Sequence, residues 1–216
     1  MTQISVLIVN FNGEGYLQAA LDSLRAQTFQ DFEIIVVDNN STDGSADDLS
    51  VDGLSKFRLL KQDKNLGFAA ASNIGVKAAK SPWVAMLNPD AEAKPDWLAN
   101  ILDGIKRHPG VSMFSCAQLC LEDSSVLDGA GDNYLAFGIP WRGGFGRSLN
   151  DLPREGECFS PCGASAVFFR DTYLSHGGLD ERFFCYCEDV DLGYRMRLAG
   201  ERCIFLPTAV VSHAGS

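Results

Sequence analysis

The sequence predicts an α/β fold in which a mostly parallel central sheet is flanked by helices. Strand-like and helix-like segments alternate regularly over residues 1–110. The strand-like segments are short, continuous apolar runs, which are typical of strands buried on both faces of a parallel sheet. Of the 216 residues, 46% are hydrophobic and 21% are charged, which are values of a globular protein.

Each element of the first half follows from a local pattern. The predicted strands cover residues 4–10, 32–37, 57–60 and 83–87. Apolar residues at helical spacing predict a helix over 16–24, and an alanine-rich run predicts another over 67–79. A third helix is expected to run to Arg107, because Pro95 suits the first turn of a helix.

The second half is less regular. Residues 111–121 predict one or two strands, 164–169 and 203–206 predict one strand each, and 188–199 predict a helix. Residues 128–150 contain six glycines and little periodicity, which favours a long loop of the kind that is often functional. We therefore expect one domain over residues 1–216, in which the irregular half builds a site.

Composition excludes several classes of protein. The chain has 28 acidic and 18 basic residues, and its net charge of −10 disfavours general nucleic-acid binding. It has no apolar run of the ~20 residues that a membrane-spanning helix needs. No signal peptide is recognised, so a cytoplasmic protein with reduced thiols is expected. The seven cysteines are interpreted as buried small residues without a metal, since repeated C-x₂-C spacing is missing.

Polar and aromatic residues follow three of the predicted strands. The carboxyl ends of the strands in an open α/β sheet lie at one edge, where ligands bind. A single Asp after a strand is more often a turn residue, but three such strand ends together favour a ligand site. The residues are Asn10, Phe11 and Asn12 after the first strand, Asp38 after the second, and Asn88 and Asp90 after the fourth.

Two common phosphate-binding motifs are missing. Gly13-x-Gly15 lacks the third glycine of a dinucleotide fingerprint, because position 18 is Gln. No glycine-rich loop ending in Lys-Ser or Lys-Thr occurs. A divalent cation held by Asp90 is therefore the favoured way for this acidic chain to hold a diphosphate.

The motifs of the chain resemble those of inverting family 2 glycosyltransferases with the GT-A fold. In order, they are IVNFN at 8–12, VVDNNSTDGS at 36–45, NLGFAAASNIG at 65–75, LNPD at 87–90, GLDERFF at 178–184 and EDVDLGYR at 188–195. The resemblance extends over essentially the whole chain, and is closest to rhamnosyltransferase-like members that build bacterial surface polysaccharides. It implies a nucleotide-binding half, 1–110, and an acceptor and catalytic half, 111–216. Members often continue past this point, so the chain is either a short member or lacks a C-terminal segment.

The resemblance also implies a donor site and a metal site. It places Phe11, Asp38, Asn65, Gly67, Asn88 and Asp90 around the nucleotide sugar. Asp38 would accept a hydrogen bond from the imide N–H of uracil or thymine, and Phe11 would stack on the base. Mn²⁺ or Mg²⁺ would be bound by Asp90 and His213. The structural alternatives are a turn for Asp38, a strand end for residues 88–90 and a structural role for His213.

Glu188, Asp189 and Asp191 place three acids at the start of a predicted helix. Such acids can simply favour the helix dipole, and Asp191 has the spacing to pair with Arg195. The preceding aromatic run, 183–187, is expected to be buried, which makes a solvated helix start a poorer explanation for the first two acids. The resemblance implies that Asp189 is the general base, with Glu188 as the alternative.

These observations predict a hexosyltransferase. It would transfer a sugar from a dTDP- or UDP-sugar to a glycan or a lipid-linked glycan, at the inner face of the membrane or free in the cytoplasm. One alternative is a non-catalytic nucleotide-sugar-binding domain, which would have no use for the Glu188–Asp189 pair. Another is a sugar-nucleotide nucleotidyltransferase, which is disfavoured because residues 11–16 contain no Arg or Lys.

Overall fold

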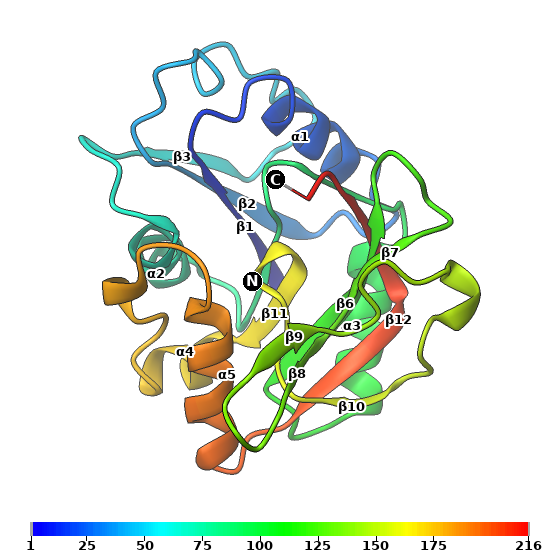
Figure 1. Cartoon of the computed structure of the whole chain (residues 1–216). Coiled ribbons are helices and arrows are strands. Elements are labelled where there is room, and N and C mark those ends of the chain that lie inside the picture. The colour runs from blue at the N-terminus through cyan, green and yellow to red at the C-terminus, as the bar shows by residue number, and fades with distance from the viewer. Residues whose placement is uncertain (1, 216) are drawn as a thin grey trace.

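The computed structural model describes residues 2–215; Met1 and Ser216, the two ends of the expected domain, lie outside the described residues. Most strands form one large sheet in the order β10-β12-β6-β11-β4-β1-β2-β3 (Figure 1). The strands of the structure are β1 (Ile4–Asn10), β2 (Phe32–Asp38), β3 (Phe57–Lys61), β4 (Trp83–Met86), β5 (Ala91–Ala93), β6 (Met113–Cys120), β7 (Leu127–Ala130), β8 (Asp132–Tyr134), β9 (Pro140–Arg142), β10 (Gly156–Cys158), β11 (Ala166–Phe169) and β12 (Cys203–His213).

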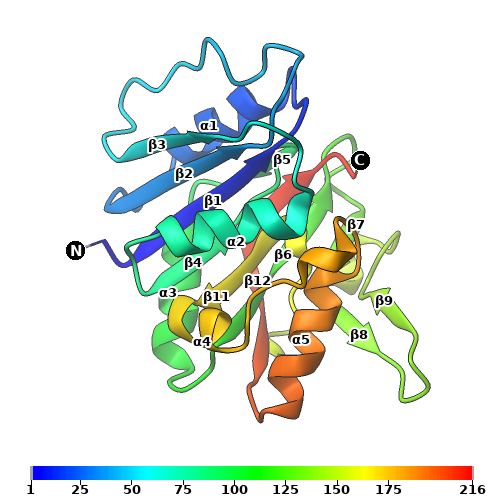
Figure 2. The same ribbon diagram turned by 90° about the vertical axis from the view of Figure 1, so that its left-hand side faces the viewer.

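Helices cover both faces of this sheet. They are α1 (Leu17–Arg25), α2 (Phe68–Ala78), α3 (Trp97–Arg107), α4 (Arg170–Ser175) and α5 (Glu188–Leu198). Helices α1 and α3 pack on one face, and α2, α4 and α5 pack on the other, where Figure 2 shows them in front of the strands. Single turns of 3₁₀ helix occur at Leu149–Asp151, Gly163–Ser165 and Glu181–Phe183.

Strand β1 shows why both faces are covered. Alternate side chains of a strand point to opposite faces of a sheet. Ile4, Val6 and Ile8 pack with α1 and α3, whereas Leu7 and Val9 pack with α2. All seven residues of β1 are buried, as the continuous apolar run predicts.

The two halves of the sheet differ in strand direction. Strands β3, β2, β1 and β4 pair in parallel, which confirms the alternating pattern predicted for residues 1–110. Beyond them, β11 runs antiparallel to both β4 and β6, and β12 pairs in parallel with β6. The site described below lies on this second, mixed half and at the carboxyl ends of the parallel strands.

Residues 128–150 are not the structureless loop that their glycines suggested. They contain part of β7 and the β8–β9 hairpin, which forms a separate two-stranded sheet. The glycines are needed for close backbone contact: a Cβ atom on Gly143 would lie 2.7 Å from the carbonyl oxygen of Gly131. Strand β12 is also longer than the 203–206 predicted, because its register with β6 shifts between Leu206 and Val210 and then continues to His213.

Candidate active site

The ends of β1 and β2 bring two sequence-predicted residues into contact. Asn10 and Asp38 are partners in the strand register, and the Asn10 side-chain amide donates to Asp38 Oδ1 at 3.1 Å. The Ser41 hydroxyl donates to the same oxygen at 2.6 Å. Asp38 is buried, whereas Phe11 is 47% exposed beside it in sequence. The carboxylate therefore orders the turn after β2, and Phe11 is free to contact a ligand.

Asn65 and Gly67 belong to a loop that is fastened to the same turn. The Asn39 side-chain amide donates to Asn65 Oδ1 at 2.8 Å, and Asn39 Oδ1 accepts from the Leu66 amide at 2.9 Å. Gly67 has φ +84°, and a Cβ atom there would lie 2.6 Å from the side chain and the carbonyl oxygen of Phe184. Gly67 thus lets the start of α2 touch the loop that leads into α5.

A chain of polar contacts links the end of β4 with β12 and β7. His213 Nε2 lies 3.3 Å from Asp90 Oδ1 and 3.2 Å from the Asn88 side-chain nitrogen. On the other side of the ring, Nδ1 lies 2.8 Å from Asp128 Oδ2. Arg142 of β9 donates from Nη1 to both oxygens of Asp128 at 3.0 Å. The structure therefore brings Asn88, Asp90 and His213 together, as the metal-site prediction requires.

The charges around His213 set its protonation. Burial alone would lower the pKa of His213, but hydrogen bonds and negative charge from Asp128 and Asp90 raise that pKa to about 9. In the metal-free protein the ring is thus a cation between two acids, both of which are buried. A divalent cation would replace that positive charge and meet a carboxylate oxygen and an imidazole nitrogen, a donor pair that suits Mn²⁺.

One cavity of about 290 Å³ opens beside this group. Of the sequence-predicted residues, Asn88, Glu188, Asp189 and His213 line it. Phe11, Asp38, Asn65, Gly67 and Asp90 are not part of its wall, although Asp90 contacts His213. The cavity therefore connects the predicted metal ligands with the predicted bases, and the nucleotide-binding residues lie outside it.

The two candidate bases differ in their surroundings. Asp189 is held by two backbone amides, since Gly163 donates to Oδ2 at 2.7 Å and Val190 donates to Oδ1 at 2.8 Å. Glu188 is 5% exposed, and its Oε2 is a buried atom without a hydrogen-bond partner among the described residues. Burial, and then the charge of Asp189, raises the pKa of Glu188 to about 7. Asp189 is thus the more rigidly oriented of the two carboxylates.

The aromatic run before these acids is exposed, contrary to expectation. Phe184 is 51% exposed and Tyr186 73%. Phe184, Tyr186 and Cys187 all have positive φ, between 62° and 73°, which is unusual for residues other than glycine. The run is not a core segment but a strained loop, and its residues 185–187 form part of the cavity wall. Strain of this kind is typical of functional loops.

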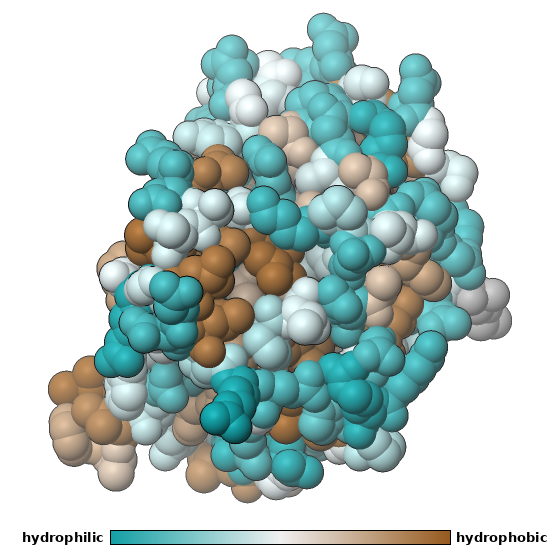
Figure 3. Space-filling model, turned by 90° about the vertical axis from the view of Figure 1, so that its right-hand side faces the viewer, coloured by the Kyte–Doolittle hydropathy of each residue, from teal (hydrophilic) through white to brown (hydrophobic). Residues whose placement is uncertain are grey.

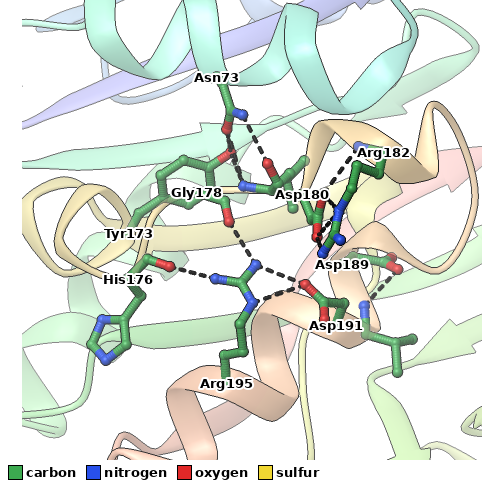
Figure 4. Close-up of polar contacts among 11 residues, drawn as sticks. Asn73, Tyr173, His176, Gly178, Asp180, Arg182, Asp189, Asp191 and Arg195 are labelled. Carbon is green, nitrogen blue, oxygen red and sulfur yellow. Dashed lines mark hydrogen bonds and ion pairs between the residues drawn. The ribbon is translucent and has the colours of Figure 1, made fainter.

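A polar network holds the segment that leads into α5 (Figure 4). Arg195 pairs with Asp191 at 2.8 Å, as predicted, and also donates to the carbonyl oxygens of His176 and Gly178. Asn73 of α2 accepts from the Tyr173 hydroxyl at 2.7 Å and donates to the Leu179 carbonyl at 2.8 Å. The motif at 178–195 therefore fixes the start of α5, and with it Asp189, relative to α2 and α4.

Sequence reasoning missed three residues of the site. Asp128, Asp132 and Arg142 line cavities in the structure but lie in the glycine-rich segment, whose composition predicts a loop. Each of the three is next to a glycine in the sequence (Gly129, Gly131 and Gly143), and no spacing marks any of them as a site residue. Asp132 and Asp189 each have a carboxylate oxygen within 4.8 Å of the Cys162 sulfur and of one another.

The cysteines do not form one class. Cys116, Cys162 and Cys203 are buried, as expected, but Cys185 and Cys187 are exposed beside the cavity. All seven are free thiols.

Among the described residues, no helix is both long and apolar enough to cross a membrane.

A comparison with protein families gives one match. A family model described as "Glycosyl transferase family 2" matches residues 5–174. The N-acetylglucosaminyl-diphospho-decaprenol L-rhamnosyltransferase of Mycobacterium tuberculosis (strain ATCC 25618 / H37Rv) is 29% identical, and the alignment covers 97% of this chain and 75% of that protein. An uncharacterized glycosyltransferase of Haemophilus influenzae is 25% identical over 86% of this chain and 57% of its own length.

Solved structures share the fold. The structure of GalNAc-T7 with UDP, GalNAc and Mn²⁺ superposes with a TM-score of 0.79 at 18% identity, over 99% of this chain and 44% of that one. The mannosyltransferase PcManGT from Pyrobaculum calidifontis, in complex with GDP-Man and Mn²⁺, gives 0.71 at 21% identity, over 98% and 56%. This chain thus spans about half the length of these solved proteins.

Proposed function

The chain belongs to glycosyl transferase family 2 and has the GT-A fold, and from this premise we propose that it transfers a sugar from a UDP- or dTDP-sugar to a hydroxyl of a cell-surface glycan. One observation carries the proposal: a single cavity is lined both by His213 and Asn88 of the predicted metal group and by the predicted base Asp189. A single displacement needs the groups that bind the leaving diphosphate on one side of the reacting sugar and the base for the incoming hydroxyl on the other side.

Asp38 and Phe11 would bind the base of the donor. The Asp38 carboxylate is fixed by Asn10 and Ser41, so it can accept the imide N–H of uracil or thymine without first becoming ordered. The exposed ring of Phe11 offers an apolar face to the base. In this proposal Asn65 and Gly67 act through their loop, which Asn39 fastens to the turn after β2.

Asp90 and His213 would hold a divalent cation, with Asn88 beside it. Their donor atoms lie within 3.3 Å of one another before any cation binds, and a carboxylate with an imidazole fits Mn²⁺. When bound, such an ion neutralises the diphosphate as negative charge develops on it. Asp128 keeps the His213 ring turned toward Asp90.

Asp189 would act as the general base. Its carboxylate removes the proton of the acceptor hydroxyl as that oxygen forms a bond with the anomeric carbon. The bond from the anomeric carbon to the diphosphate oxygen breaks, and its electron pair leaves with the diphosphate. A single displacement of this kind inverts the anomeric centre. Glu188 remains the alternative base, because its pKa of about 7 also suits proton transfer near neutral pH.

We infer a lipid-linked glycan as the acceptor, at the inner face of the membrane. Figure 3 shows apolar side chains gathered in patches on the face at the right of Figure 1. The segment 135–149 carries exposed apolar residues, among them Phe137, Ile139, Trp141 and Phe145, and Trp141 also lines the cavity. The mycobacterial relative is named for a lipid diphosphate acceptor. Apolar contacts of this kind would hold the chain at a membrane surface.

A panel of nucleotide sugars tests the proposal. The melting temperature of the protein is measured with each compound, with and without Mn²⁺. In a separate assay, the nucleoside diphosphate released is measured with alkyl glycosides as acceptors. A donor at 100 times its Kd should add about 2.7 kcal/mol of stability. Binding without turnover with any acceptor would favour a non-catalytic binding domain, and formation of a nucleoside triphosphate when pyrophosphate is added to the nucleotide sugar would favour a nucleotidyltransferase. Binding that persists in excess chelator would contradict the role of the cation.

A further inference from the structure

Asp132 is a buried acid on the wall of the cavity that the steps proposed above do not use. It begins β8, pairs in register with Arg142 of β9, and is 6% exposed. Its backbone is fixed on the other side as well, because its amide donates to the carbonyl oxygen of Ser160 at 2.9 Å. The position of this residue is therefore set by strand pairing on both sides.

The carboxyl group of Asp132 has no hydrogen bond or ion pair with another of residues 2–215. It lines the cavity, and one of its oxygens lies within 4.8 Å of the Asp189 carboxylate. An acid that is almost completely buried without a partner lowers stability unless a ligand satisfies it. Its orientation into the cavity indicates where that ligand binds.

The surroundings of Asp132 favour a sugar ring. Trp141 of β9 lines the same cavity and is 44% exposed, so one aromatic face is available beside the acid. Behind the hairpin, the Tyr134 ring stacks on Phe159 at a centroid distance of 4.9 Å and packs against Tyr194 of α5 at 5.2 Å. This aromatic cluster ties β8 to the helix that carries Asp189, which keeps the two acids at a fixed separation.

We propose that Asp132 hydrogen-bonds the acceptor hydroxyl adjacent to the one that Asp189 deprotonates, so that the enzyme selects acceptors with a vicinal diol. The proposal rests on the function proposed above. The two carboxylates have oxygens within 4.8 Å of one another, so two neighbouring hydroxyls of one sugar ring can each reach one acid. Asp132 would then set which hydroxyl of the ring faces the base, and thereby the linkage formed.

The protonation of Asp132 agrees with this role. Burial, and then the negative charge of Asp189, raises the pKa of Asp132 to about 8, against a smaller opposing effect of Arg142. A neutral carboxyl group at physiological pH can donate to a hydroxyl oxygen and leaves Asp189 as the only acid of the pair that takes up the acceptor proton.

A double-mutant cycle tests the proposal. Two acceptor glycosides are compared, the parent compound and its deoxy analogue without the hydroxyl next to the reacting one, in the wild-type protein and in Asp132→Ala. The wild type should lose about 10- to 100-fold in kcat/KM on the deoxy analogue, because a buried acid is left unpaired. Asp132→Ala should treat both glycosides alike. Glu122→Gln, an exposed acid of the same half, is the matched control and should discriminate as the wild type does.

Several results would overturn the proposal. One is Asp132→Ala discriminating against the deoxy analogue as strongly as the wild type. Another is an additional Mn²⁺ or Zn²⁺ bound by the wild type and lost in the variant, which would make Asp132, Cys162 and Asp189 a cation site. If Asp132→Ala does not fold, Asp132→Leu, which fills a similar volume and cannot hydrogen-bond a hydroxyl, is used in the same cycle. No transfer by the wild type from any nucleotide sugar would instead refute the proposed function itself, and this is seen before any variant is made.

Discussion

Asp128 accepts a hydrogen bond from Nδ1 of His213 at 2.8 Å, and this contact points the other ring nitrogen at Asp90. The two residues lie on β7 and at the end of β12, which are far apart in sequence. Arg142 in turn holds both oxygens of Asp128. A carboxylate behind a metal-binding histidine fixes the ring orientation and makes the ring a better ligand.

Replacing Asp128 with Asn should therefore weaken Mn²⁺ binding without removing a ligand. The expected loss is about 10- to 100-fold in affinity, the usual effect of changing a residue behind a ligand. Titration of the protein with Mn²⁺ in the presence of UDP, followed by electron paramagnetic resonance, measures this directly. Glu122→Gln serves as the control. Equal Mn²⁺ affinity in Asp128→Asn and the wild type would show that His213 does not bind the ion.

Asp189→Asn should lose most of its turnover while the protein still binds the donor. Asn can keep one of the two backbone hydrogen bonds from Gly163 and Val190, but it cannot take the acceptor proton. Loss of a general base typically lowers kcat by about 10²–10⁴-fold. Melting temperature, donor affinity and kcat are measured on one preparation, together with Glu188→Gln. Full turnover in Asp189→Asn with loss in Glu188→Gln would assign the base to Glu188.

Asp38→Ala should weaken UDP or dTDP binding by about 1–3 kcal/mol, as expected for a lost hydrogen bond to a charged group. Because Asp38 also orders Ser41, the comparison needs Asp38→Asn, which can still accept from the Ser41 hydroxyl. Calorimetric titration with UDP distinguishes the two roles. If Asp38→Asn binds UDP as the wild type does, Asp38 is a structural residue of the turn and its carboxylate does not recognise the base.

Stability should depend on pH through Asp132. In the unfolded chain this acid ionises near its ordinary value of 3.8, whereas in the folded protein its pKa is about 8. The folded state therefore loses stability as the pH rises from about 4 to about 8, since the unfolded chain releases the proton first. Other charged and titratable groups line the same cavity, among them Asp189, Glu188, Arg142 and Cys162. All four remain in both of the proteins compared below.

Asp132→Asn removes this dependence and should stabilise the protein at alkaline pH. We expect a gain of about 1–3 kcal/mol at about pH 9 and a smaller one at about pH 5, because the acid is neutral in the fold there. Urea unfolding of both proteins at each pH gives the difference. A gain that is the same at both values would mean that the buried group does not titrate in this range.

The parallel half of the fold could be predicted because its signals are local. The seven buried residues of β1 and the apolar spacing of α1 each specify an element without reference to the rest of the chain. The β8–β9 hairpin could not be predicted in this way. Gly143, which follows the hairpin, is required by close contact with Gly131 and not by a local turn, so composition alone favours a loop for this segment.

The residues of the candidate site fall into the same two groups, those that local sequence predicts and those that depend on distant contacts. Asp38, Asp90 and Asp189 follow or begin regular elements, where position in a motif is informative. Asp128 and Asp132 act only through residues of other strands and helices, so no spacing in the sequence marks them. An aromatic run such as 183–187 normally indicates burial, whereas here Phe184 and Tyr186 are exposed and Tyr186 lines the cavity.

The contact between Gly67 and Phe184 has a consequence for how this chain tolerates substitution. Two independent constraints act on position 67: a backbone angle that disfavours side chains, and a neighbour that a Cβ atom would touch at 2.6 Å. A smaller residue at 184 removes its ring but not its carbonyl oxygen, so no single exchange there opens position 67 to alanine. In a library randomised at both sites and selected for the folded protein, glycine should therefore be retained at 67 while 184 varies.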